Sequence, residues 1–313
     1  MKRKEKERRT GGRAGVLLLL AMLGIPLLAP QSAHGFQSVV YFSTEESFVA
    51  TAGPHAGQLI SHGDLLSTTG VVVATNAQLM GNFGPMPPPP DFGLDGVYVR
   101  ASGEILFSIE DTFWDEGLGT NVQHGDLLSD TGTIVQTNQQ LWGNFGPMPS
   151  PNPPDYGLDA IHEVSDTEVQ FSLEGGFFDE VLGTNVRHGD LLSDAGVIVK
   201  TNAQLLANFG PMPVAGDYGL DGVHKVGSGE ILFSIEDTFW DENLATNVGH
   251  GDLLSDTGSV ILTNAQLLAA FFGGAANVPE DYGLDAIWVV PEPATISLLG
   301  VGGLILLLKR RRG

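Results

Sequence analysis

The sequence predicts an all-β repeat protein, and three observations favour a four-bladed β-propeller with end-to-end strand closure. One string, His-Gly-Asp-Leu-Leu-Ser, recurs four times at spacings of 62, 64 and 62 residues. Each copy holds short segments in which apolar and polar residues alternate, which is typical of half-buried strands. The first copy lacks a strand segment that the last copy has in excess. Four short strands in about 62 residues match one propeller blade with an enlarged loop.

Four marker strings occur in the same order in every copy. Phe-Ser-x-Glu begins at Phe42, Phe107, Phe171 and Phe233. His-Gly-Asp-Leu-Leu-Ser begins at His62, His124, His188 and His250. Thr-Asn-x-Gln-Leu begins at Thr75, Thr137, Thr201 and Thr263. Asp-(Phe/Tyr)-Gly-Leu-Asp begins at Asp91, Asp155, Asp217 and Asp281. This fixed order indicates tandem copies of one structural unit.

The copy at residues 158–219 shows how its first two strands are predicted. Residues 158–164 are the first strand candidate, and the Ser-Asp pair after it is a turn. Residues 168–174 are the second, with polar side chains on one face. The opposite face is apolar and comprises Val169, Phe171 and Leu173. This period of two predicts a strand with one buried face.

The rest of the same copy predicts a loop, two further strands and a short helix. A polar loop anchored by aromatic residues 177–178 leads to strand candidates at 188–193 and 197–200. Thr201 and the Asn after it are good N-cap residues, so we expect a helix over 203–208. Gly-Pro-Met-Pro then ends the unit, because glycine and proline do not continue a helix.

The two ends of the repeat region predict ring closure. The first copy starts at a second-strand segment, residues 39–45, and the last copy ends with an extra first-strand segment, residues 284–290. Together these fragments complete one unit, so pairing between them would remove a sheet edge. The alternative is an open β-solenoid or a linear β-repeat array, which should carry atypical capping repeats.

The repeated His-x-Asp pair is the first candidate for metal binding. Its members are His62, Asp64, His124, Asp126, His188, Asp190, His250 and Asp252. Imidazole and carboxylate are good metal ligands, and residues i and i+2 of a strand share one face. The alternative is structural, with Gly-Asp making a turn and the histidine packing beside an aromatic loop. No cofactor is firmly predicted; calcium or another divalent cation is the candidate.

A second repeated carboxylate stands at the start of the first strand of each unit. Its four positions are Asp95, Asp159, Asp221 and Asp285. An aspartate here is expected to accept backbone N–H groups and fix the turn. Calcium binding is the alternative, and the acidic stretch 110–116 could add oxygen ligands, although it lacks the spacing of a dedicated calcium loop.

Catalysis has little support in the sequence. It lacks a Gly-x-Ser-x-Gly elbow, a His-Glu-x-x-His motif and a phosphate-binding Gly-Lys loop. Near-identical repeats give four similar environments, whereas acid–base chemistry needs groups with separated pKa values. The copies differ mainly in loop length and at Tyr98, His162, His224 and Trp288, which is a thin basis for an active site. Four aromatic residues could stack on sugars or pack as anchors: Trp114, Trp142, Phe178 and Trp240. We therefore expect a protein that is not an enzyme.

Composition excludes several classes of protein. The 313 residues include no cysteine, so there is no disulfide framework and no cysteine nucleophile. The formal net charge of -22 argues against nucleic acid as a partner. Between residues 36 and 308, only four Lys and Arg stand against 35 acidic residues, a charge of about −31. Such an acidic domain attracts cations.

Residues 1–35 have the three parts of a secretory signal peptide. Seven Lys and Arg lie within the first 13 residues, and an apolar run follows from 14 to 29. Ala33 and Gly35 then fit a small-x-small cleavage site. We expect export, with residues 36–290 forming one domain of four repeats.

Residues 291–313 carry a second candidate targeting signal. Pro291, Glu292 and Pro293 precede an apolar segment at 296–308, and a basic cluster ends the chain. This cluster is Lys309, Arg310, Arg311 and Arg312. The apolar segment would span about 20 Å as a helix, so flanking residues must help it cross a membrane. Positive charge after the span predicts a cytoplasmic end.

This ordered arrangement resembles the PEP-CTERM sorting signal of Gram-negative bacteria. The resemblance implies an exosortase-like processing enzyme as a partner, an inner-membrane anchor before processing, and delivery to the cell surface or an exopolysaccharide matrix. We therefore expect a binding or structural protein of that surface. The alternatives are a secreted polysaccharide-acting enzyme and a calcium-stabilised adhesin.

Overall fold

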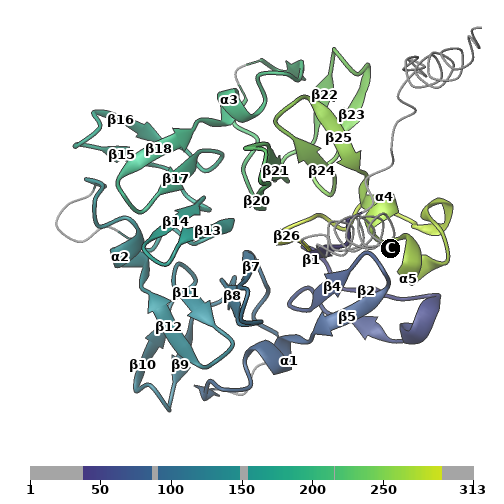
Figure 1. Cartoon of the computed structure of the whole chain (residues 1–313), viewed down its shortest axis with the longest axis horizontal. Helices are drawn as coiled ribbons and strands as arrows, with labels where there is room; N and C mark the ends of the chain where they lie inside the picture. The colour runs from purple at the N-terminus through teal and green to yellow at the C-terminus, as the bar shows by residue number, and fades with distance from the viewer. Residues whose placement is uncertain (1–37, 87–90, 149–153, 215, 291–313) are drawn as a thin grey trace, which may run out of the picture. The chain divides into compact units, whose positions relative to one another are not determined.

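The computed structural model describes residues 38–86, 91–148, 154–214 and 216–290, and they form an all-β structure of antiparallel sheets with short helices (Figure 1). The predicted signal peptide and sorting segment lie outside these residues. Within them, none of the helices combines the length and the apolar character needed to cross a membrane.

Four four-stranded sheets follow the four repeats. The first comprises β26 (Ile287–Val289), β1 (Val40–Phe42), β4 (Leu65–Ser67) and β5 (Val71–Ala74). The second comprises β7 (Val97–Val99), β8 (Ile105–Phe107), β11 (Leu127–Ser129) and β12 (Thr133–Gln136). The third comprises β13 (Ile161–Ser165), β14 (Glu168–Phe171), β17 (Leu191–Ser193) and β18 (Val197–Lys200). The fourth comprises β20 (Val223–Lys225), β21 (Ile231–Phe233), β24 (Leu253–Ser255) and β25 (Ser259–Leu262).

A hairpin leaves each sheet between its second and third strands. Three hairpins are alike: β9 (Phe113–Asp115) with β10 (Thr120–Val122), β15 (Phe177–Asp179) with β16 (Thr184–Val186), and β22 (Phe239–Asp241) with β23 (Thr246–Val248). The first copy instead has β2 (Phe48–Val49), the 3₁₀ turn η1 (Gly53–His55) and β3 (Leu59–Ile60). Two short strands add to hairpins of the following copy, β6 (Pro85–Met86) to β9 and β19 (Pro211–Met212) to β22.

A one-turn helix follows the fourth strand of each sheet. These helices are α1 (Asn76–Leu79), α2 (Asn138–Leu141), α3 (Asn202–Leu205) and α4 (Asn264–Leu267). The threonine before each one accepts a hydrogen bond from the glutamine N–H at N3, and that glutamine reaches back to the threonine N–H. This capping box satisfies helix donors that would otherwise lack partners. The last copy adds α5 (Ala269–Phe272) and the 3₁₀ turn η2 (Ala275–Asn277).

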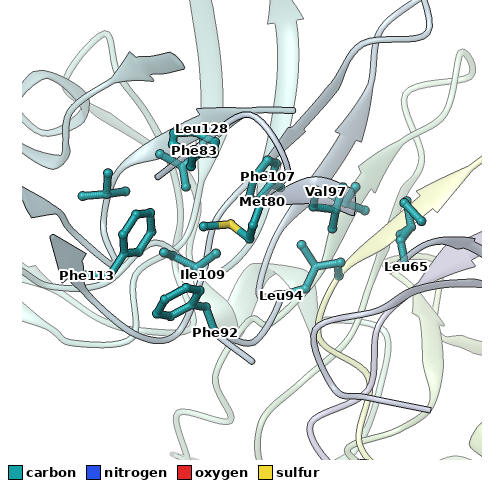
Figure 2. Packing of buried hydrophobic residues seen from close by; sticks show 14 of the residues in the cluster. Leu65, Met80, Phe83, Phe92, Leu94, Val97, Phe107, Ile109, Phe113 and Leu128 are labelled. Carbon is teal, nitrogen blue, oxygen red and sulfur yellow. The ribbon is translucent and has the colours of Figure 1, made fainter. Parts of the chain in front are cut away.

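The hydrophobic core is divided into clusters that each join two successive sheets. One cluster combines Leu65 of the first sheet with Phe107 and Leu128 of the second (Figure 2). Within it Phe83 packs edge-on against Phe107 and Phe113, with ring centroids 6.4 and 6.2 Å apart. Similar clusters join the second sheet to the third and the third to the fourth. Sheet-to-sheet packing therefore depends on residues repeated in each copy.

The first and last strands of the repeat region pair with each other. Antiparallel β1 and β26 align Val40 with Val289 and Phe42 with Ile287 (Figure 1). The first strands of the sheets also make contacts in a cycle, β7 with β13, β13 with β20, β20 with β26 and β26 with β7. The expected pairing of the 39–45 and 284–290 segments is thus present.

Several local predictions need correction. The aromatic loop at 177–178 is the β15–β16 hairpin, because its two strands pair with each other outside the main sheet. The third strand starts at Leu191 and not at His188, which lies in a turn. The helix spans Asn202–Leu205 in place of 203–208, because capping by Thr201 starts it one residue earlier.

Candidate functional site

The aspartates of the His-x-Asp pairs act as local caps. Asp64 accepts hydrogen bonds from the backbone N–H of Ser61 at 3.1 Å and of Asn76 at 2.9 Å. The same pair of bonds recurs at Asp126, Asp190 and Asp252. Each aspartate therefore fixes both the turn before the third strand and the first turn of the helix. Burial raises the pKa of these carboxyls.

The histidines of the same pairs contact carboxylates that arrive from elsewhere. His62 Nδ1 lies 3.1 Å from Glu110 of the second copy, and its Nε2 lies 3.4 Å from Asp91. His124 and His188 repeat this arrangement with Glu174 and Glu236. His250 contacts Glu45 of the first copy at 3.0 Å, which links the last repeat to the first. We call these four residues the inter-sheet histidines; the hydrogen bond to glutamate raises the pKa of each.

The predicted metal chelation by each His-x-Asp pair does not match this geometry. The prediction required both residues on one strand face, yet the histidine lies in a turn before the strand and its partner aspartate caps a helix. Among the described residues, the group of acidic or imidazole side chains with three converging ligand atoms is Glu45, Asp221 and Asp285. The histidine ligand set, His62, His124, His188 and His250, is absent from it.

The second repeated aspartate also departs from expectation. Asp95, Asp221 and Asp285 are buried at 4 to 8% exposure, and Asp159 is half-buried. In the described part of the chain, Oδ2 of each of the three buried aspartates is without a hydrogen-bond partner. They therefore do not use this oxygen to fix a turn. Instead the four aspartates line one cavity with the four glutamates of the Phe-Ser-x-Glu strings.

A separate pocket gathers the positions at which the repeats differ. Its volume is about 790 Å³, and its lining includes Tyr98, His162, His224 and Trp288. Each of these residues lies on the first strand of its sheet. Tyr98, His224 and Trp288 are the central residues of their three-residue strands, and His162 is the second residue of β13. Neighbouring rings pack edge-on, with centroids 5.5 Å apart for Tyr98 and His162 and 5.6 Å apart for the two histidines.

The two pocket histidines are neutral at physiological pH. Burial, helped by the nearby Lys225, lowers the pKa of His162 to about 4, and burial lowers that of His224 to about 4. Nδ1 of His162 lies 3.4 Å from the Lys225 N–H, and Nδ1 of His224 lies 3.4 Å from the Val289 N–H. A neutral imidazole that accepts at Nδ1 carries its proton on Nε2. Both rings therefore keep an N–H donor at Nε2.

Charged side chains stand at the same pocket. Arg100 donates from Nε to both oxygens of Glu163 at 3.0 Å, from Nη2 to Glu163 Oε1, and from Nη1 to Glu104 at 2.9 Å. This bidentate geometry holds the guanidinium in place. Lys225 also lines the pocket. Two of the four cationic residues between 36 and 308 thus lie at this pocket, whereas the rest of that segment is strongly acidic.

The aromatic candidates for sugar stacking fall into two groups. Trp142 is buried at 8% exposure, so it packs in the core. Trp114, Phe178 and Trp240 are each 46% exposed and occupy equivalent hairpin positions opposite an asparagine. They remain a second candidate surface, because a half-exposed ring beside an amide can contact a sugar.

Sequence reasoning recognised the positions of the pocket only as differences between copies. Among the Phe-Ser-x-Glu glutamates, only Glu110 was given a role, as part of the acidic stretch 110–116, although the constancy of all four beside the repeated aspartates was visible. Their convergence depends on how the sheets pack, which the strings do not reveal. The repeat difference at Tyr98, His162, His224 and Trp288 was visible in the sequence but was interpreted only as a thin basis for an active site.

Comparisons with known proteins concern mainly the C-terminus. The family model described as the PEP-CTERM protein-sorting motif matches residues 289–312. No curated protein matches the chain. One similar solved structure is the extracellular domain of BT4673 from B. thetaiotaomicron, with a TM-score of 0.25 and 8% sequence identity. The similarity covers 67% of this chain and 26% of that one, so this chain spans about a quarter of its length.

Proposed function

We propose that this protein binds a saccharide at the bacterial surface or in the exopolysaccharide matrix. The C-terminal PEP-CTERM motif marks a secreted protein that an exosortase sorts. The observation that carries the binding role is the convergence of Tyr98, His162, His224 and Trp288, the equivalent residues of the four repeats, on one pocket of about 790 Å³. The equivalent position carries Tyr98, His162, His224 or Trp288, so the four repeats together supply aromatic rings and imidazole donors to one pocket.

The proposed scaffold for this pocket is a closed four-bladed β-propeller, with each four-stranded sheet as a blade. Support comes from the cycle of contacts among the first strands and from the pairing of β1 with β26. An open array would leave these two strands unpaired at opposite ends. In the closed ring, Tyr98, His162, His224 and Trp288 come from four different blades and surround one end of the axis.

The chemistry of the pocket suits a sugar ring. Tyr98 and Trp288 offer apolar ring surface, and the imidazoles offer neutral Nε2–H donors for hydroxyl groups. Lys225 adds positive charge, which favours a saccharide that bears a carboxylate or another anionic group, whereas the charge of Arg100 is compensated by Glu163 and Glu104. We infer binding and not catalysis, because Glu163, the carboxylate in the pocket lining, is paired with Arg100 and is therefore not a free acid or base.

The test is saccharide binding by the full-length chain purified in detergent. A glycan array identifies a ligand, and titration with tryptophan fluorescence measures its affinity. His224→Phe keeps a ring but removes the N–H donor, so we expect binding at least about tenfold weaker, or ~1.4 kcal/mol. Trp240→Ala is the matched control on a hairpin and should bind like the wild type.

Two results would overturn this proposal. If Trp240→Ala abolishes binding while His224→Phe keeps it, the half-exposed hairpin aromatics are the binding surface. If the wild type cleaves the saccharide that it binds, the protein is an enzyme.

A further inference from the structure

The cavity of eight carboxylates is a second feature that the saccharide pocket does not use. Its volume is about 470 Å³, and its lining consists of Glu45, Asp95, Glu110, Asp159, Glu174, Asp221, Glu236 and Asp285. Each repeat contributes one glutamate from Phe-Ser-x-Glu and one aspartate from the Gly-Leu-Asp string. No basic side chain belongs to this lining.

Within the described chain, each glutamate of the cluster pairs with an inter-sheet histidine, whereas three of its aspartates keep an oxygen without a partner. Oδ2 of Asp95, Asp221 and Asp285 is buried and makes no hydrogen bond there, although these residues are 92 to 96% buried. An uncompensated buried carboxylate costs several kcal/mol, so such groups bind a proton or a cation. Burial, and then the neighbouring carboxylates, raise the pKa of Asp221 and Asp285 well above the ordinary range.

Three of the eight carboxylates already have the spacing of a ligand set. One oxygen from each of Glu45, Asp221 and Asp285 lies within 4.8 Å of the other two. An all-oxygen anionic set selects a hard cation, and calcium takes six to eight oxygens in flexible geometry. The cavity also has room for waters, since one water occupies about 30 Å³.

We propose that this cavity binds a calcium ion through Glu45, Asp221 and Asp285, with water completing the coordination. The ion would join segments that are far apart in sequence. Glu45 follows β1, Asp285 precedes β26, and Asp221 precedes β20. Bound calcium would therefore hold the first and last strands of the domain together and neutralise the carboxylates that burial disfavours.

The experiment uses the full-length chain in detergent, stripped with EGTA at pH 7.5. About 1 mM calcium, in the range where extracellular calcium modules bind, should raise the melting temperature, because a ligand of the folded state stabilises it. Calorimetric titration should show one site. Asp285→Asn should bind calcium at least about tenfold more weakly. The control Glu180→Gln removes an exposed carboxylate and should respond like the wild type.

The melting temperature of the variant without calcium separates a metal ligand from a structural aspartate. Asp285→Asn replaces a buried carboxyl group that must bind a proton when no cation is present, so in EGTA the variant should melt at or above the wild-type temperature. Its melting temperature should then not rise when calcium is added. Circular dichroism confirms that it is folded. An unchanged wild-type melting temperature in calcium would overturn the proposal, and so would an Asp285→Asn variant that responds to calcium as the wild type does.

Discussion

At the residue scale, the central glycine of each His-Gly-Asp string leaves room for side chains from another part of its repeat. An ideal Cβ at Gly189 would lie 2.2 Å from Asp217 Oδ1 and 2.3 Å from Asn202 Nδ2. Hydrogen bonds hold both side chains in place. Asp217 accepts from the Gly189 N–H at 3.1 Å, and Asn202 donates to the Gly219 carbonyl at 3.2 Å. Glycine is therefore required here because a Cβ atom would clash with these side chains, and turn propensity alone does not explain it.

Gly189→Ala should therefore lower the free energy of unfolding by about 1–3 kcal/mol, the usual cost of overpacking. Urea unfolding followed by circular dichroism measures the loss. Gly227→Ala is the matched control, because nothing lies within 4 Å of its ideal Cβ and its backbone needs no positive φ. If the two variants are equally stable, the close packing around Gly189 is not what keeps this position as glycine.

The same residues show what the sequence could and could not predict. The repeated His-x-Asp pair was predicted to chelate a metal ion from one strand face, but its two residues do not share such a face. The register of strand and turn places His188 and Asp190 toward different partners, Glu236 and the Asn202 N–H. That register depends on hydrogen bonds across a turn, which a one-dimensional spacing does not define.

At the element scale, periodicity located strands but not their ends or their burial, since the segment predicted over 168–174 is a strand over Glu168–Phe171 in which Gln170 is buried as well as Phe171. Residues 197–200 and 168–171 are strands, and the aromatic segment near 177–178 is a hairpin that was expected to be a loop. The hairpin has two strands of three residues each, too short for alternation to identify. Convergence of carboxylates from different sheets was also beyond prediction, because it depends on packing between elements.

The one-turn helices allow a prediction about their caps. Thr201 Oγ1 accepts from the Gln204 N–H at 3.3 Å, and the Thr201 N–H donates to Gln204 Oε1 at 2.9 Å. A four-residue helix has few hydrogen bonds of its own, so the cap carries much of its stability. Thr201→Ala should cost about 1 kcal/mol. Thr201→Ser keeps the hydroxyl and should recover most of it.

Hydrogen exchange measures this effect locally. Amides of α3 should exchange faster in Thr201→Ala, whereas those of α1, which has its own cap at Thr75, should be unaffected. Equal acceleration in both helices would contradict the prediction, because it would mean that the whole fold opens and not the one cap.

At the scale of the whole molecule, two sets of histidines respond to pH in opposite directions. The inter-sheet histidines have a pKa raised above 6.5 by their glutamate partners, so their stabilising effect is complete below pH 6.5 and is lost as the pH rises through the folded-state pKa. The buried aspartates, whose pKa values are also raised, act in the same direction in the absence of a cation. Alkaline conditions therefore weaken contacts between the sheets.

The pocket histidines limit the stability of the folded protein at acid pH. His162 and His224 have a folded-state pKa of about 4 against 6.5 unfolded, so their stabilising effect is complete above pH 6.5 and is lost as the pH falls toward 4. With EGTA present, the melting temperature should pass through a maximum near about pH 6 and fall on both sides.

Two variants test this pH profile. His224→Gln should reduce the fall in melting temperature on the acid side of the maximum (the acid limb) alone. His188→Gln should reduce the fall on the alkaline side (the alkaline limb) alone. Because His188 is one of four equivalent inter-sheet histidines, its share of the alkaline slope should be at most a quarter. A His188→Gln variant whose alkaline limb matches the wild type would show that these histidines do not couple the sheets.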